Sequence, residues 1–169
     1  MQKKILLLVL NFCLLMPCTL LSRDDDNHRL FHIERSKNKN IVCYDANING
    51  SGTWDAAHPI AVYWINNEEH PGERSGLTFI QQNLAYGYKT ISKGSNTFSI
   101  TLNACNDRLI KITKGGNAYI VRTNINNREA TLQVVYVKTQ SNNSLKVEYI
   151  ELRGIDVNGN SITERIYNK

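Results

Sequence analysis

Apolar and polar residues alternate along most of the chain, which is the pattern of strands with one buried face. Phe31 and Ile33 alternate with polar neighbours, and a second alternating run follows at residues 41–46. Residues 59–66 are apolar on both faces, as expected for a covered central strand. The other runs lie at residues 98–104, 110–113, 118–123, 130–139, 145–153 and 162–167. The pattern predicts a mostly β protein with about ten strands and one helix.

Short turns between these runs predict that successive strands are neighbours. Gly115-Gly116 and Asn158-Gly159 are two-residue hairpin signals, and residues 141–143 carry further turn chemistry. Connections this short favour an antiparallel meander. Because closure or layering protects the edges of such a sheet, we expect a β-barrel or a two-layer sandwich.

One strand changes its buried face partway along. Val147 and Tyr149 share one parity, whereas Ile150 and Leu152 continue the apolar pattern on the opposite parity. A one-residue change of this kind indicates a β-bulge or sharp bend near Tyr149 and Ile150, and such bends let a sheet curl.

The single helix is expected over residues 77–86. Leu77, Ile80 and Leu84 fall at helical spacing, and Gly87 can end the helix. An amphipathic helix in a β protein usually packs on the sheet or plugs a barrel end. The alternative is that its apolar face binds a partner.

Residues 1–22 have the pattern of a secretory signal peptide. Lys3 and Lys4 precede an apolar run that is too short to span a membrane, and cleavage after Ser22 fits the pattern. Lipoprotein signals place a small residue before the modified cysteine, but Pro17 precedes Cys18, so lipidation at Cys18 is not expected.

The mature chain is then a polar tail at residues 23–29 and one β-rich domain at residues 30–169. The whole chain has 169 residues and a net charge of +5, and removal of the two signal lysines lowers the charge to +3. That charge is too small to indicate a nucleic-acid partner. No second apolar run is long enough to be a transmembrane segment.

Two cysteines remain after signal cleavage, Cys43 and Cys105. Both lie on predicted strands, and an exported protein meets an oxidising compartment, so the pair is a candidate disulfide. The alternative is two buried thiols, since sequence spacing does not fix their separation.

Candidate ligand-binding residues come from a polar turn and from apolar aromatic positions. Arg35, Lys37 and Asn38 would lie at a rim, where arginine suits phosphate, sugar acid or carboxylate groups. Trp64 or Tyr86 would line the interior. The plainer interpretation is a solvated turn and ordinary core aromatics.

Catalytic patterns are incomplete in this sequence. Its four histidines are scattered, and no metal site or cofactor motif is expected. His32 with Cys43 or Glu34 is the one combination that could support an envelope hydrolase or transferase, because adjacent strands could bring these residues together.

Three stretches carry a family resemblance: FHIERSKNKNIVCYDAN from residue 31, PIAVYWIN from residue 59 and LTFIQQNLAYGYK from residue 77. Together they resemble a family of small exported bacterial proteins, catalogued as domain of unknown function number forty-eight thirty-three. The resemblance implies an envelope context, periplasmic or at the cell surface, and implies no activity.

We therefore expect a non-catalytic binding or interaction module of the bacterial envelope. Its partner would be a small ligand, a glycan or an envelope protein, and no cofactor is expected. The alternatives are the hydrolase or transferase above and a structural accessory subunit.

Overall fold

The computed structural model describes residues 28–55, 57–116 and 118–167, and it is mostly β, as the sequence predicts. Within these residues eleven strands join in one sheet. The strands are β1 (Arg29–Arg35), β2 (Asn38–Ala46), β3 (Ile60–Asn66), β4 (Glu73–Gly76), β5 (Tyr88–Lys93), β6 (Thr97–Leu102), β7 (Cys105–Gly115), β8 (Ala118–Ile125), β9 (Arg128–Gln140), β10 (Asn143–Asp156) and β11 (Ser161–Tyr167). A short helix, α1 (Phe79–Gln81) continued by η2 (Gln82–Tyr86), lies between β4 and β5.

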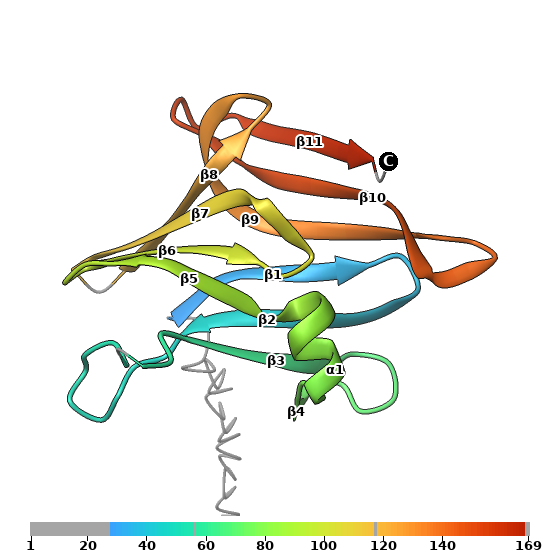
Figure 1. The fold of residues 1–169 in the computed structure, drawn as a ribbon, viewed down its shortest axis with the longest axis horizontal. Coiled ribbons are helices and arrows are strands. Elements are labelled where there is room, and N and C mark those ends of the chain that lie inside the picture. The colour runs from blue at the N-terminus through green and yellow to red at the C-terminus, as the bar shows by residue number, and fades with distance from the viewer. Residues whose placement is uncertain (1–27, 56, 117, 168–169) are drawn as a thin grey trace, which may run out of the picture.

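The sheet is built from two antiparallel meanders joined through one parallel pair. The strand order is β4-β3-β2-β1-β9-β8-β7-β6-β5, and β10 and β11 follow on the other edge of β9 (Figure 1). His32 to Arg35 of β1 run parallel to Val134 to Val137 of β9. The expected meander is therefore correct within β1–β4 and within β5–β11, and wrong at their junction.

Strand β9 makes the sheet curl because two strands share one of its edges. Its beginning pairs with β8, from Arg128 to Thr131, and its later part pairs with β1. Strand β10 follows most of the opposite edge. The result is a curled, open half-barrel (Figure 1). Neither a closed barrel nor a two-layer sandwich describes it fully.

Strand β10 carries the predicted bulge. Its register against β9 shifts between Val147 and Tyr149, so Tyr149 turns to the outer face while Ile150 and Leu152 line the inside. A further shift follows at Gly154, where a Cβ atom would lie 2.3 Å from the carbonyl oxygen of Thr131. Only glycine allows this approach of the two backbones.

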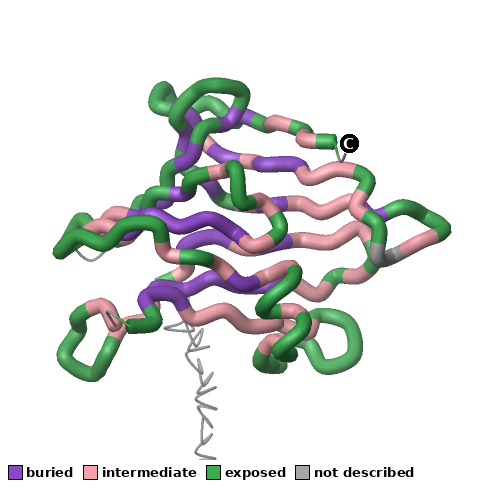
Figure 2. Tube along the Cα trace, in the orientation of Figure 1, coloured by how far each residue is buried: buried purple, intermediate pink, exposed green. Residues whose placement is uncertain are grey.

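The hydrophobic core lies on the inner face of the curled sheet. Phe31 and Tyr44 stack with ring centroids 4.4 Å apart, and both side chains are almost fully buried. Figure 2 shows buried residues along the middle of the sheet and exposed residues in the turns. Residues 29–46 form an antiparallel hairpin of β1 and β2, and its turn is only Ser36 and Lys37.

The helix is shorter than residues 77–86 and differs in its packing. Thr78 is the N-cap and forms a capping box with Gln81, so the helix begins late. Leu77 packs against the core, whereas Ile80 and Leu84 are 67% and 73% exposed. The wider π-helical turn of η2 changes the spacing of side chains, so the predicted apolar face does not pack as a unit.

The cysteine prediction requires a correction, because Cys43 and Cys105 are not joined by a disulfide. Cys43 alternates with Val42 and Tyr44 of the core, so it lies on the outer face of β2, where it is 0% exposed. Cys105 lines the inside of the half-barrel. The sheet itself separates the two thiols.

The expected signal peptide (residues 1–22), Cys18 and tail residues 23–27 lie outside the described residues and stay predictions. Arg29, expected in the tail, is the first residue of β1 and forms an ion pair with Asp45 of β2. Among the described helices, none has the length and apolar character needed to cross a bilayer.

Candidate functional site

A pocket of about 510 Å³ opens inside the half-barrel, between the curled strands and the end of the helix. We call it the sheet pocket. Its walls come from β1 and from β6 to β11, and the helix contributes Ala85 and Tyr86. Most of the wall is aliphatic, including Ile33, Leu132, Val135, Ile150 and Leu152.

Three of the five predicted ligand-binding residues converge at one side of this pocket. Arg35 and Tyr86 both line it, and the guanidinium carbon of Arg35 lies 5.7 Å from the ring centroid of Trp64. Trp64 meets Tyr86 edge to face, with centroids 5.2 Å apart. Residues from β1, β3 and the helix thus form one cluster, which we call the arginine–aromatic cluster.

Hydrogen bonds hold the aromatic members of this cluster in place. The indole Nε1 of Trp64 donates to Oε1 of Gln81 at 3.3 Å. The Tyr44 hydroxyl donates to the backbone carbonyl of Tyr86 at 2.6 Å. Burial raises the pKa of Tyr44 well above its usual value, so this hydroxyl stays a donor at any physiological pH.

The other two predicted residues do not line the sheet pocket. Lys37 is exposed in the turn between β1 and β2, and Asn38 pairs with Arg35 across the hairpin. Of the three residues predicted at the rim, only Arg35, the last residue of β1, lines the pocket.

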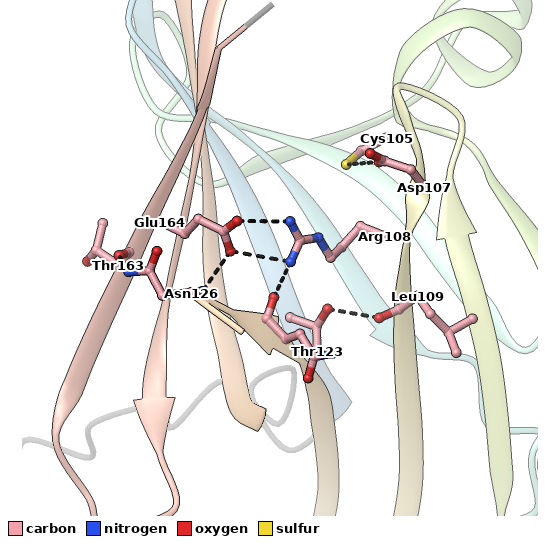
Figure 3. Close-up of polar contacts among 9 residues, drawn as sticks. Cys105, Asp107, Arg108, Leu109, Thr123, Asn126, Thr163 and Glu164 are labelled. Atoms are coloured by element: carbon pink, nitrogen blue, oxygen red, sulfur yellow. Dashed lines mark hydrogen bonds and ion pairs between the residues drawn. The ribbon is translucent and has the colours of Figure 1, made fainter. Parts of the chain in front are cut away.

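Two charged residues that the sequence pattern did not single out, Asp107 and Arg108, line a different wall of the pocket near the start of β7, and Figure 3 shows their polar contacts. Arg108 donates two hydrogen bonds to Glu164 of β11, at 3.0 and 3.3 Å. The backbone N–H of Asn126 donates to the same carboxylate at 2.8 Å, and its side-chain amide donates to the carbonyl of Thr163. We call Arg108, Asn126 and Glu164 the clasp, because they connect the edge strand β11 to β7 and to the turn after β8.

Cys105 is the pocket thiol. Its Sγ donates to Oδ1 of Asp107 at 3.4 Å (Figure 3). Burial raises the pKa of the Cys105 thiol to about 11, and the hydrogen bond to Asp107 acts in the same direction. A thiol that stays protonated at neutral pH is a poor nucleophile.

The residues of the catalytic alternative are neighbours on the outer face. His32 lies directly opposite Cys43, and its Nε2 is 3.5 Å from Oε1 of Glu34. Cys43 has no exposed surface, so a substrate cannot reach its sulfur in this structure. Glu34 also accepts a hydrogen bond from Arg153 at 2.9 Å. The geometry brings these groups together without exposing a nucleophile.

The structure also has a more open cleft, about 690 Å³, between β3, β5 and the helix. Its wall includes Phe79, which is 81% exposed, and Tyr88, whose hydroxyl is bonded to the backbone of Ile60. This cleft is larger than the sheet pocket but more open to solvent. Within the described ranges, no three histidine, cysteine, aspartate or glutamate residues are grouped as metal ligands would be.

Comparison with protein families finds one match. Residues 31–165 match the family described as Domain of unknown function (DUF4833). Neither a curated protein nor a solved structure matches the chain.

Proposed function

This chain belongs to the DUF4833 family, a domain of unknown function, and we propose from its geometry that it is a small-molecule-binding protein of the bacterial envelope. The ligand would have an apolar part that occupies the sheet pocket. Binding, rather than a reaction, is the proposed activity.

The observation that carries the proposal is the sheet pocket itself. Its volume of about 510 Å³ falls within the range of roughly 300–1,000 Å³ that is usual for small-ligand sites. Its wall is mostly aliphatic, with polar groups at the Arg35 side and at the start of β7, and a mostly apolar lining with a few polar groups is usual for such sites. A filled core would leave no space of this size, since protein interiors pack closely.

The pattern of residues 1–22 supports export to the envelope, in the periplasm or at the cell surface. The buried Cys43 and the protonated Cys105 both count against the hydrolase or transferase alternative, because neither thiol is an accessible, activated nucleophile.

Binding can be tested with a neutral fluorescent probe, N-phenyl-1-naphthylamine, whose emission rises in apolar surroundings. The wild type should bind it, and Val137→Trp should bind much less, because Val137 lines the pocket. Val134→Trp is the matched control, since Val134 lies on the same strand, pairs with His32 and faces outward. Circular dichroism checks that each variant folds.

Loss of probe emission in Val137→Trp alone would support the proposal. Equal emission from all three proteins would place the probe outside the pocket, and no emission change in the wild type would count against a binding function.

A structural accessory subunit is the second candidate, and one observation favours it. Phe79, Ile80 and Leu84 are 81%, 67% and 73% exposed on one short helix, which is unusual for apolar side chains. An Ile80→Asp variant should then lose an envelope protein that co-purifies with the wild type. A wild-type protein that purifies alone as a monomer would count against this role.

A further inference from the structure

We propose that the ligand of the sheet pocket is a long-chain carboxylate whose head group binds Arg35 and whose alkyl chain lies along the aliphatic wall. This inference rests on the proposed binding function and adds the chemical class of the ligand.

Arg35 has no carboxylate partner within the described chain, unlike six of the seven other arginines there. Six arginines each lie within ion-pair distance of an aspartate or glutamate: Arg29, Arg108, Arg122, Arg128, Arg153 and Arg165. For Arg35 the recorded side-chain contact is the ring of Trp64. A guanidinium at a pocket wall without an anion is a site for one.

The arginine–aromatic cluster also orients the Arg35 guanidinium for binding an anion. A guanidinium over an indole face keeps its edge N–H groups for a planar oxyanion, and stacking restricts its rotamers. Trp64 is in turn held by Gln81 at 3.3 Å. Less conformational entropy is therefore lost when a carboxylate binds.

Tyr86 offers a second donor beside Arg35. Burial raises the pKa of Tyr86, and the nearby charge of Arg35 lowers it only partly, so its hydroxyl is protonated at neutral pH. Within the part of the chain that is described, this hydroxyl donates no recorded hydrogen bond. A carboxylate could accept from both groups.

Other charged groups of the pocket favour the same placement of the head group. Arg108 is already neutralised by Glu164 in the clasp. Asp107 adds a negative group to the wall at the start of β7, which would repel a carboxylate placed there. The Arg35 side is therefore the favourable one for an anion.

The rest of the pocket suits an alkyl chain. Leu132 and Val137 both line it and lie five positions apart on β9, which corresponds to about 16 Å along a strand. Ile33, Ile110 and Leu152 line the same space. A linear alkyl chain of intermediate length would make van der Waals contacts with these side chains, which face empty space when the pocket holds no ligand.

Displacement of N-phenyl-1-naphthylamine by three amphiphiles of equal chain length tests the head group. Dodecanoate, dodecanol and dodecylamine share their alkyl chain and differ in charge, and each is used below its micelle concentration. Wild-type protein should bind dodecanoate about ten- to a hundredfold more tightly than dodecanol, the usual range for a charge-assisted hydrogen bond, and dodecylamine most weakly.

Two variants locate the cation. Arg35→Met should lower dodecanoate affinity to the level of dodecanol and leave dodecanol unchanged. Lys37→Met is the matched control, because it removes the same charge two residues away at an exposed position, and it should bind like the wild type.

The outcomes separate this inference from the binding function. Equal affinity for dodecanoate and dodecanol, or an Arg35→Met variant that keeps the preference, would overturn the inference and leave the binding function standing. Failure of the wild type to bind the probe would overturn the binding function itself. The wild-type comparison needs no variant, so a folding defect in Arg35→Met does not leave the inference untested.

Discussion

The outer and inner faces of the sheet around β9 and β10 differ in how their charged groups are paired. On the outer face, Glu151 accepts hydrogen bonds from both Arg153 and Arg165, and Arg153 also donates to Glu34. The same arginines lie over tyrosine rings, Arg153 over Tyr136 at 4.9 Å and Arg165 over Tyr149 at 5.0 Å. Every charge of this outer-face network has a partner within the protein.

The inner face has few charges, and one of them lacks a partner of opposite sign. Val135 and Leu152 pair directly across β9 and β10 and line the sheet pocket. Arg35 lies at the wall of that pocket, with its guanidinium near the ring of Trp64 and no carboxylate within ion-pair distance among the described residues.

This difference separates arginines whose donors are already used within the protein from one whose donors are available to a ligand. A satisfied arginine contributes to the surface of the sheet, and its contacts already use its donors. An arginine beside an apolar pocket with its donors available has binding capacity left for a ligand. Substitutions on the two faces should therefore differ in effect, and the largest effect is expected in the core.

Neighbouring residues of β1 should differ most in their contribution to stability. Phe31→Ala removes a fully buried ring that stacks on Tyr44, and should lower the free energy of unfolding by about 3–5 kcal/mol. His32→Ala, one residue away on the outer face, should cost less than about 1 kcal/mol. Urea unfolding at pH 7 measures both. Similar losses would mean that the outer face is as much a part of the core as the inner face.

The two thiols should also differ, in how fast they react with iodoacetamide. Cys105 has partial access to solvent, but its pKa of about 11 keeps the thiolate fraction at neutral pH about a hundredfold below that of an ordinary cysteine. Its labelling rate should therefore keep rising up to about pH 11. Cys43 should label only in denaturant, because it is 0% exposed. Labelling followed by peptide mass spectrometry assigns each site, and fast labelling of Cys43 in the native protein would contradict this account of the outer face.

Local patterns in the sequence predict the local parts of this fold. Alternation fixes most strands, the hairpin turns appear where glycine and asparagine indicate them, and the parity change at Tyr149 predicts the bulge. Tyr86, which lines the pocket, and Trp64, which contacts Tyr86, could be chosen as candidates, because aromatic residues in apolar segments commonly line ligand sites.

Contacts between distant segments could not be predicted in this way. Strands β1 and β9 pair in parallel although they are far apart in the sequence and no short turn connects them. No local pattern specifies such a pairing. Arg108 and Glu164 lie 56 residues apart and belong to no motif. Ile80 and Leu84 have helical spacing, but the late start at Thr78 and the π turn leave them exposed.

The clasp should stabilise the open edge of the half-barrel. Glu164→Gln removes the charge that Arg108 meets at 3.0 Å, with both side chains about four-fifths buried, and should cost about 1–2 kcal/mol. Amide hydrogen exchange should become faster in β11 before it does in β1. Glu129→Gln is the matched control, because the Arg122–Glu129 pair is about half exposed and should contribute less than about 0.5 kcal/mol. Unchanged exchange in β11 would show that its ladder with β10 is sufficient.

The outer-face network should give the smallest effect, which is visible as a dependence on pH. Hydrogen bonds from Arg165 and Arg153 lower the pKa of Glu151 below its ordinary value. A carboxylate whose pKa is depressed by folding stabilises the protein above the unfolded pKa of about 4.3, and this stabilisation is lost as the pH falls through the folded value. Wild-type stability should therefore fall more steeply below about pH 5 than that of Glu151→Gln, which cannot titrate at this position. The gap at pH 7 should be only about 1 kcal/mol, because Arg153 and Arg165 are 39% and 54% exposed and water screens their charge. Urea midpoints from pH 7 to pH 3 measure the two slopes. Parallel slopes would mean that the arginines stabilise the Glu151 carboxylate no more than water does. Arg35, which has no carboxylate partner among the described residues, would then be the one remaining difference in charge pairing between the two faces.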